Sequence, residues 1–204
     1  MTEAPEDAGY AKGRARRARI VRTAFEAFSA HGYRGASLVQ IAADSGVSRA
    51  GLVHYFPTKE SLLAAVLEER DRVDSEQFFA GVTAPVDGLD LLARFARLVE
   101  HNASNRGIVS LFAALSVEAS DPSHPAHDYI ATRYETLRRH LGAAIADLGA
   151  RGLLRDDVEV EGLAAELIAT VDGLQVQWLV APESVDMAAQ FRRRLAALVT
   201  VDLG

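Results

Sequence analysis

Sulfur-containing residues are scarce in this chain, whose 204 residues include no cysteine and two methionines. The absence of cysteine excludes a disulfide framework and thiolate metal sites, and it fits a reducing cytoplasm. Apolar runs are interrupted well before the ~20 residues that a membrane-spanning helix requires. The first twenty residues are acidic and then basic, without the apolar stretch of a signal peptide. We therefore expect a cytoplasmic protein with no membrane partner.

Charge is distributed unevenly along the chain. The net charge is -6, yet residues 11–60 carry nine lysines and arginines against three acidic residues, whereas residues 61–204 carry 13 basic and 22 acidic ones. A basic segment joined to an acidic body predicts that the basic segment alone meets a polyanion.

Apolar residues recur at helical spacing over most of the chain, and no convincing strand pattern is present. Residues 1–13 predict a disordered tail, because they are polar and have little to bury. A first helix follows and stops at Gly32, and a long one starts at Thr58. The pattern then predicts helices over 87–104, 106–119, 126–150, 160–181 and 185–201. The expected fold class is all-α.

Two short helices joined by a glycine-containing turn are predicted between the two long ones. Ser37, with Gln40 three residues later, has the spacing of a capping box. Gly46 suits the left-handed position after a helix end, and Ser48 suits the start of the second short helix, which a proline closes. Braced by the first helix, these parts predict a helix-turn-helix over about 37–56, whose second helix enters the DNA major groove.

The segment RIVRTAFEAFSAHGYRGASLVQIAADSGVSRAGLVHYFPTKESLLAAVLE resembles the DNA-binding domain of the TetR family of bacterial transcriptional repressors. The landmarks occur in order: the aromatic pair Phe25 and Phe28, the HGY stop, the SLVQIAADSGVS helix and turn, and HYFPTKESLL. The resemblance covers residues 14–74 and implies an N-terminal three-helix helix-turn-helix domain. It also implies a C-terminal helical ligand-binding and dimerisation domain over 75–204.

DNA contacts are implied for both helices of the helix-turn-helix and the start of the following helix. The resemblance implies backbone contacts from Ser37, Ser48, Tyr55 and Lys59, and base or groove contacts from Gln40, Arg49, Ala50, Gly51 and His54. Each could instead be an ordinary cap or surface residue. The arginines before them form either an arm that reaches DNA or a solvated helix end: Arg14, Arg16 and Arg17. Many relatives have tyrosine in place of Val53, which can touch a thymine methyl group but cannot form a hydrogen bond.

The resemblance further implies that the C-terminal region encloses a pocket whose occupant changes the spacing of two DNA-binding heads. The candidate ligand contacts are Phe95, Leu98, His101, Asn102, Phe112, Leu115, Glu118, Tyr134, Gln175 and Trp178. Ordinary core packing explains the apolar members equally well, and buried polar residues often serve only helix ends or one another.

Other kinds of site find little support in the sequence. His124, His127 and Asp128 have helical spacing that metal ligands can use, but they lie at a loop and helix start where such residues commonly cap. No nucleophile and base or glycine-rich phosphate loop is found. We expect no metal, no cofactor and no enzyme activity.

The last two predicted helices carry apolar stripes. In the family the equivalent helices meet their copies across a two-fold axis, which implies a dimer interface formed by Leu163, Leu167, Val171, Leu174, Trp178, Met187, Phe191, Leu195 and Leu198. The alternative is that both stripes are buried within their own subunit.

The resulting expectation is a homodimeric repressor that binds a palindromic operator in double-stranded DNA and is released by an unknown small-molecule effector. A DNA-binding protein without an effector, an activator, and a helical interaction module with a vestigial head are the alternatives.

Overall fold

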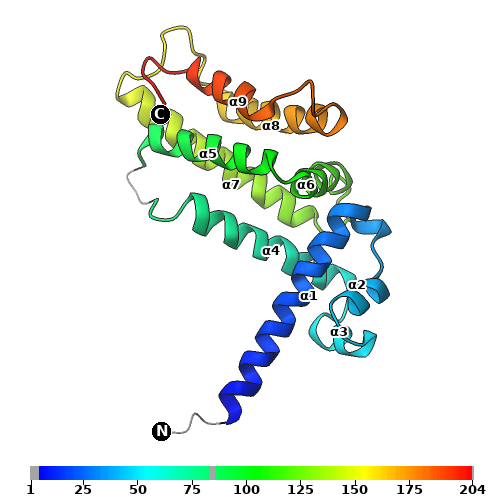
Figure 1. Ribbon diagram of the computed structural model, residues 1–204. Coiled ribbons are helices and arrows are strands. Elements are labelled where there is room, and N and C mark those ends of the chain that lie inside the picture. The colour runs from blue at the N-terminus through cyan, green and yellow to red at the C-terminus, as the bar shows by residue number, and fades with distance from the viewer. Residues whose placement is uncertain (1–4, 83–85, 204) are drawn as a thin grey trace. The chain divides into compact units, whose positions relative to one another are not determined.

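A computed structural model describes residues 5–82 and 86–203, which form nine helices and no named strand (Figure 1). The chain divides into two compact units between Arg72 and Val73. The expected all-α fold is confirmed.

The first unit contains the helix-turn-helix region and its bracing helices. Its helices are α1 (Pro5–Gly35), α2 (Leu38–Asp44), α3 (Arg49–Tyr55) and the first part of α4 (Lys59–Phe78). Regular helical geometry in α1 is interrupted at Gly32, whose φ of 70° is accessible to glycine at little cost. Apolar side chains from all four helices are fully buried, among them Ile20, Phe28, Ile41, Leu52 and Leu62.

The expectation of a disordered tail over residues 1–13 requires correction, since α1 begins at Pro5. Residues 1–4 lie outside the described part. The next turns have few apolar groups to bury, but a helix that is already nucleated by packing from Ile20 onward extends backward at little cost through alanine, arginine and lysine. The side chains of residues 14–19 are accordingly exposed on a helix.

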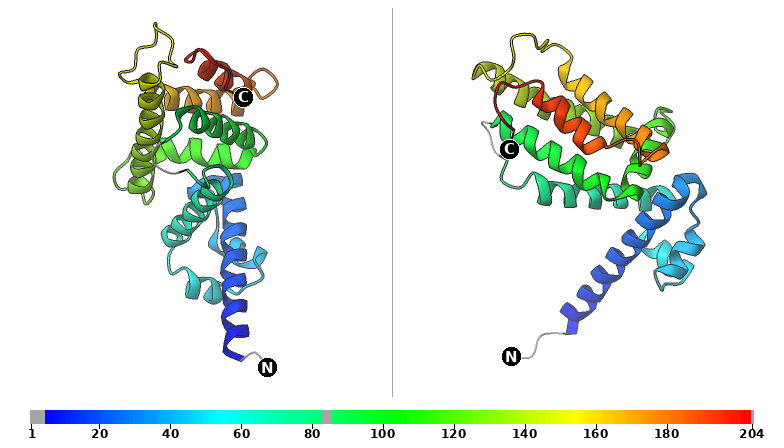
Figure 2. Two further views of the ribbon diagram at one scale, coloured as in Figure 1. Left: turned by 90° about the vertical axis from the view of Figure 1, so that its left-hand side faces the viewer. Right: turned by 45° about the horizontal axis from the view of Figure 1, so that its top comes forward.

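The second unit is a bundle of five helices, together with the end of α4. They are α5 (Gly88–Ala103), α6 (Arg106–Glu118), α7 (His127–Ala150), α8 (Leu163–Val180) and α9 (Met187–Ala196). Helices α5 and α7 pack together, α9 lies along α5, and α8 lies against α6, α7 and α9 (Figures 1 and 2). The core between α5, α7, α8 and α9 contains the fully or almost fully buried side chains of Leu92, Ala144, Leu148, Leu167 and Leu195.

Helix α9 ends at Ala196, five residues before the end expected from the sequence. The chain beyond it pairs with the loop after α7: the amide of Arg155 donates to the carbonyl oxygen of Leu198, and the amide of Thr200 donates to that of Leu153, each at 2.9 Å. This pairing buries Leu198 and Val199, so the apolar residues that extended the helical pattern lie in a turn and an isolated bridge instead of a helix.

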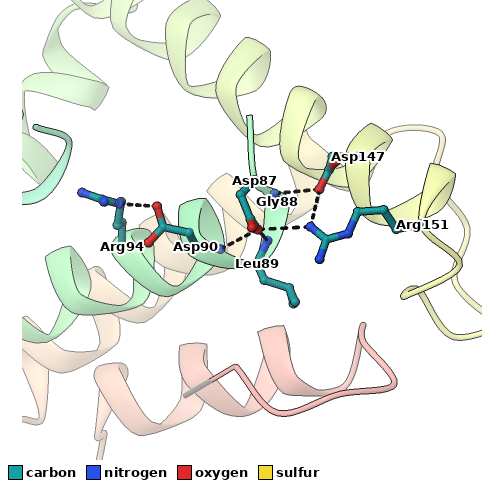
Figure 3. Close-up of polar contacts among 7 residues, drawn as sticks. All are labelled: Asp87, Gly88, Leu89, Asp90, Arg94, Asp147 and Arg151. Carbon is teal, nitrogen blue, oxygen red and sulfur yellow. Dashed lines mark hydrogen bonds and ion pairs between the residues drawn. The ribbon is translucent and has the colours of Figure 1, made fainter. Parts of the chain in front are cut away.

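A polar clamp fixes the start of α5 against the end of α7 (Figure 3). The Asp147 carboxylate accepts a hydrogen bond from the amide of Gly88 at 2.8 Å, and Asp87 caps α5 through the amides of Leu89 and Asp90. Arg151 bridges Asp147 at 3.0 Å and Asp87 at 3.2 Å. Because Gly88 is buried beside α7, the two helices approach more closely here than a side chain would permit.

Candidate functional site

The turn between α2 and α3 is fixed by backbone hydrogen bonds. Gly46 has a φ of 67°, its amide donates to the carbonyl oxygen of Ala43, and the amide of Val47 donates to that of Ala42 at 3.0 Å. Such a left-handed glycine satisfies the free carbonyl groups of a helix end. The buried Ser45 hydroxyl adds a bond to the Ile41 carbonyl oxygen at 2.7 Å. The left-handed position predicted for Gly46 is confirmed.

The capping box predicted at the start of α2 does not form. Ser37 occupies the cap position, but its side chain makes no capping hydrogen bond, while Gln40 donates from Nε2 to Asp44 Oδ1 at 2.7 Å. Gln40 therefore pairs with a residue one turn later instead of reaching back to the cap. Both Ser37 and Gln40 remain exposed, so their contacts with DNA stay a prediction.

Helix α3 is short, capped and exposed on one side. Ser48 Oγ accepts a hydrogen bond from the amide of Gly51 at 3.0 Å, which confirms the predicted cap. Leu52 and the following Phe56 are buried and hold the helix against the unit. The side chains left exposed are Arg49, Ala50, Val53 and His54.

Lys59 has a structural role beside its predicted contact with DNA. Its ammonium group donates to the carbonyl oxygen of Arg34 at 3.1 Å and lies 5.0 Å from the centre of the Tyr33 ring. Burial lowers the pKa of Lys59, while the charge of Glu60 acts in the opposite direction. The Tyr33 hydroxyl donates to Glu60 at 2.8 Å, so the break in α1 and the start of α4 are joined by neighbouring polar contacts.

Tyr55 is half-buried at the far end of α3. Its hydroxyl oxygen lies near α1, 4.0 Å from where a Cβ atom on Gly13 would lie. Its ring meets the His54 ring edge-on at 5.5 Å between centroids. Tyr55 thus lies between α3 and α1, beside the exposed His54.

The arginines predicted as an arm lie on a helix. Arg14 stacks on Tyr10 at 4.7 Å, and Arg17 lies 5.1 Å from the centre of the Phe56 ring. Both side chains are exposed, as is Arg16. The three arginines therefore form a helical row of positive charges, and their contact with DNA stays a prediction.

The side chains predicted to contact an effector come from α5 to α8, and several belong to the core. The buried members are Phe95, Leu98, Asn102, Phe112 and Leu115. Partly exposed members are His101, Glu118, Tyr134, Gln175 and Trp178.

Tyr134 belongs to a cluster of polar side chains, and it is the one member that was predicted from the sequence. Its hydroxyl donates to Asp172 Oδ2 at 2.8 Å, and burial raises the pKa of both groups. Nearby, the Arg133 guanidinium lies 4.6 Å from the centre of the Phe112 ring. Asp172 and Arg133 were not predicted as site residues. For Asp172 the sequence did contain a signal, because it is the one acidic residue in the apolar run LIATVDGLQVQW.

The histidines at and just before the start of α7 make structural contacts. His124 is buried, its Nδ1 accepts a hydrogen bond from the amide of Ala126 at 3.1 Å, and its Nε2 lies 3.5 Å from Glu118 Oε2. His127 Nδ1 lies 2.8 Å from the carbonyl oxygen of Ala119. These contacts join the end of α6 to the start of α7.

The stripes assigned to a dimer interface require correction. Most of their side chains are buried in this chain's own core: Leu163, Leu167, Leu174, Met187, Phe191, Leu195 and Leu198. Val171 and Trp178 are partly buried and pack against that core. Helical periodicity identified the buried faces but could not reveal which chain buries them.

Two family models match the chain. The model for "Bacterial regulatory proteins, tetR family" matches residues 20–66, and that for "BetI-type transcriptional repressor, C-terminal" matches residues 93–200, more than half of the chain. The first match includes the whole turn between α2 and α3.

Curated relatives are transcriptional regulators. The chain is 27% identical over 179 residues to the probable HTH-type transcriptional regulator ArpR of Pseudomonas putida, covering 84% of this chain and 83% of ArpR. It is 28% identical over 155 residues to the HTH-type transcriptional repressor SCO4008 of Streptomyces coelicolor, covering 76% of each.

Solved structures share the fold. A transcriptional regulator from Saccharomonospora viridis in complex with choline has a TM-score of 0.77 at 23% identity, covering 93% of this chain and 100% of that one. The SmeT–triclosan complex has a TM-score of 0.75 at 22% identity, with 93% and 94% covered; SmeT is a repressor of a Stenotrophomonas maltophilia efflux pump. The two family models establish that the chain belongs to the TetR family, and with the curated relatives they show that it is a transcriptional regulator.

Proposed function

We propose that this regulator is a homodimeric repressor in the bacterial cytoplasm, which binds a palindromic operator through α3 and leaves it when a small molecule binds the second unit. The observation that carries the proposal is the exposed face of α3, held in place by the Ser48 cap and the buried Leu52. A short helix fixed by one face and exposed on the other has the form required to enter a major groove. The positive charge of residues 11–60 complements phosphate.

The proposed dimer surface lies on α8, on the side away from the core. Its exposed residues follow one another at spacings of three and four: Ala165, Ala169, Gly173, Val176 and Val180. Val176 is 51% exposed and Val180 is 82% exposed. Although α8 is long and apolar enough to cross a membrane by length and composition alone, it packs against α6, α7 and α9. The same face of a second copy would cover these exposed apolar residues, and the small side chains would allow the two helices to pack closely.

The proposed effector site lies among α6, α7 and α8. The Tyr134–Asp172 pair and the Arg133 side chain supply hydrogen-bonding and charged groups beside Phe112. The choline complex of the S. viridis protein and the triclosan complex of SmeT support a small-molecule effector here by analogy. An effector that favours a head spacing unsuited to successive major grooves must lose affinity for the protein when DNA binds, by the same factor.

The first experiment is selection of bound sequences from a random double-stranded DNA library. We expect an inverted repeat whose half-sites lie about one helical turn apart or somewhat more. Arg49→Ala should weaken binding to that sequence, while Arg138→Ala, an exposed arginine on α7, serves as the charge-matched control. Enrichment of no sequence by either native or refolded protein, from which any ligand has been stripped, would contradict operator binding.

The dimer is tested by placing charge on α8. Val180→Glu should shift the sedimenting mass from dimer to monomer and weaken operator binding, because a carboxylate would be buried between two apolar faces. Val160→Glu, at a 50%-exposed position before α8, is the matched control. A Val180→Glu protein that remains dimeric would locate the interface elsewhere.

The effector is tested by a thermal-shift screen of small molecules that includes choline and triclosan. A compound that raises the melting temperature must also lower operator affinity if it acts by release. Raised operator affinity would indicate recruitment to DNA, and no response to any compound would favour the alternative without an effector.

A further inference from the structure

The exposed face of α3 has an apolar centre. At about 100° per residue, Arg49, Val53, Ala50 and His54 follow one another around roughly 140° of the helix circumference. All four side chains are exposed, while Leu52 on another side of the helix is fully buried. The two residues in the middle of the exposed arc are therefore Val53 and Ala50, with Arg49 on one flank and His54 on the other.

Packing within the chain leaves the Val53 side chain 41% exposed. Neither Val53 nor Ala50 has a side-chain atom that can form a hydrogen bond with a phosphate or a base edge. The surface around them is nevertheless basic, through Arg49 and the excess of lysine and arginine in residues 11–60. A complementary partner has anionic groups at its edges and small apolar groups between them.

The DNA major groove has this combination of groups. Phosphates line its edges, and the C5-methyl group of thymine is its apolar feature. A valine or alanine side chain recognises that methyl by excluding water from it, without a hydrogen bond.

We propose that Val53 and Ala50 select operator half-sites by contact with thymine methyl groups at the one or two base steps that face the centre of α3. This inference rests on the proposed function, in which α3 enters the major groove. It assigns methyl recognition to the centre of the helix and leaves hydrogen bonding to its flanks.

The test uses the full-length protein and the selected operator. Each thymine of the half-site is replaced in turn by deoxyuridine, which retains the base pair and removes only the methyl group. We expect about fourfold weaker binding per half-site at one or two positions, the factor for a buried group of that size. Replacements elsewhere in the half-site should leave the dissociation constant unchanged at the same salt concentration.

The variant Val53→Ala tests whether Val53 is the residue that contacts the thymine methyl group. The variant should bind the thymine operator more weakly, and at one position the effect of deoxyuridine should fall below twofold, since interacting groups are not additive. Val39→Ala is the matched control, because Val39 is a 58%-exposed valine on α2. With this control the full deoxyuridine effect should remain.

Three results would overturn methyl recognition while leaving operator binding intact: a half-site without thymine, equal affinity for thymine and deoxyuridine at every position, or an undiminished deoxyuridine effect in Val53→Ala. In each case binding that depends on Arg49 would still support the proposed function. A failure of the native and refolded protein to enrich any sequence would overturn both.

Discussion

Replacement of Gly88 by alanine tests how closely α5 must approach α7. A Cβ atom added to Gly88 would lie within the contact distance of the Ala144 carbonyl oxygen and 2.8 Å from Leu148 Cγ. Carbon atoms normally pack at about 3.5–4.0 Å, so the start of α5 would have to move by roughly 1 Å. Backbone forms part of the obstacle, and rotation of a side chain cannot relieve it.

The expected loss of stability follows from three contributions. Overpacking of this kind costs about 1–3 kcal/mol, and displacement of α5 would weaken the 2.8 Å hydrogen bond from Gly88 to Asp147, a charged acceptor, by up to about 2 kcal/mol. Better helix propensity of alanine offsets at most about 1 kcal/mol. We therefore expect a net loss of about 2–3 kcal/mol, which lowers the melting temperature by about 5–10 °C.

The assay is thermal unfolding followed by circular dichroism, together with urea unfolding. Gly142→Ala is the matched control, since Gly142 lies within α7 and a Cβ atom there would meet nothing within 4 Å. This control should be stabilised by about 0.5–1 kcal/mol. A Gly88→Ala protein as stable as the Gly142→Ala protein would refute the close approach described for α5 and α7.

Further predictions concern helix caps and charge. Asp87→Asn keeps a capping side chain but removes the charge; hydrogen bonding from the Asp90 amide, with a further contribution from Arg151, lowers the pKa of Asp87 in the folded protein. The stabilisation by the Asp87 charge is thus complete above the ordinary pKa of an aspartate and is lost as pH falls through the lowered value. The free energy of urea unfolding should therefore fall less between pH 6 and pH 3 for Asp87→Asn than for the native protein. An equal fall in both proteins would contradict this. Ser48→Ala should cost about 1 kcal/mol in thermal unfolding, whereas Ser37→Ala, which removes no capping bond, should be nearly neutral, and equal losses would argue against the difference. Lys59→Met should reduce the dependence of log affinity on log salt by about one, because the bond to Arg34 leaves two ammonium donors for a phosphate; an unchanged slope with lower stability would assign Lys59 to the structural contact alone.

Local rules predicted the turn between α2 and α3 well. A left-handed glycine and a serine cap have the same chemistry in any protein, so Gly46 and Ser48 could be placed from their neighbours alone. The same rules failed at Gln40, where two partners lay within reach of one side chain, and Asp44 accepted the hydrogen bond.

Predictions that required knowledge of distant contacts were less successful. The two stripes that contain Leu167 and Leu195 were correctly predicted to be buried faces, yet periodicity does not distinguish a subunit core from a dimer interface. Similarly, the apolar pattern continued past Ala196, but pairing of Thr200 with Leu153 ended the helix. The Tyr134–Asp172 pair joins residues 38 positions apart, so spacing alone could not connect them.

Helix α4 has a practical consequence for any attempt to separate the two units. The division between Arg72 and Val73 falls inside a helix that continues from Lys59 to Phe78. A fragment cut at that division would end in the middle of a helix and lose the amide groups that pair with the carbonyl groups of residues 69–72 in the whole helix. An isolated N-terminal fragment should therefore retain residues through Phe78, where the helix has its natural end.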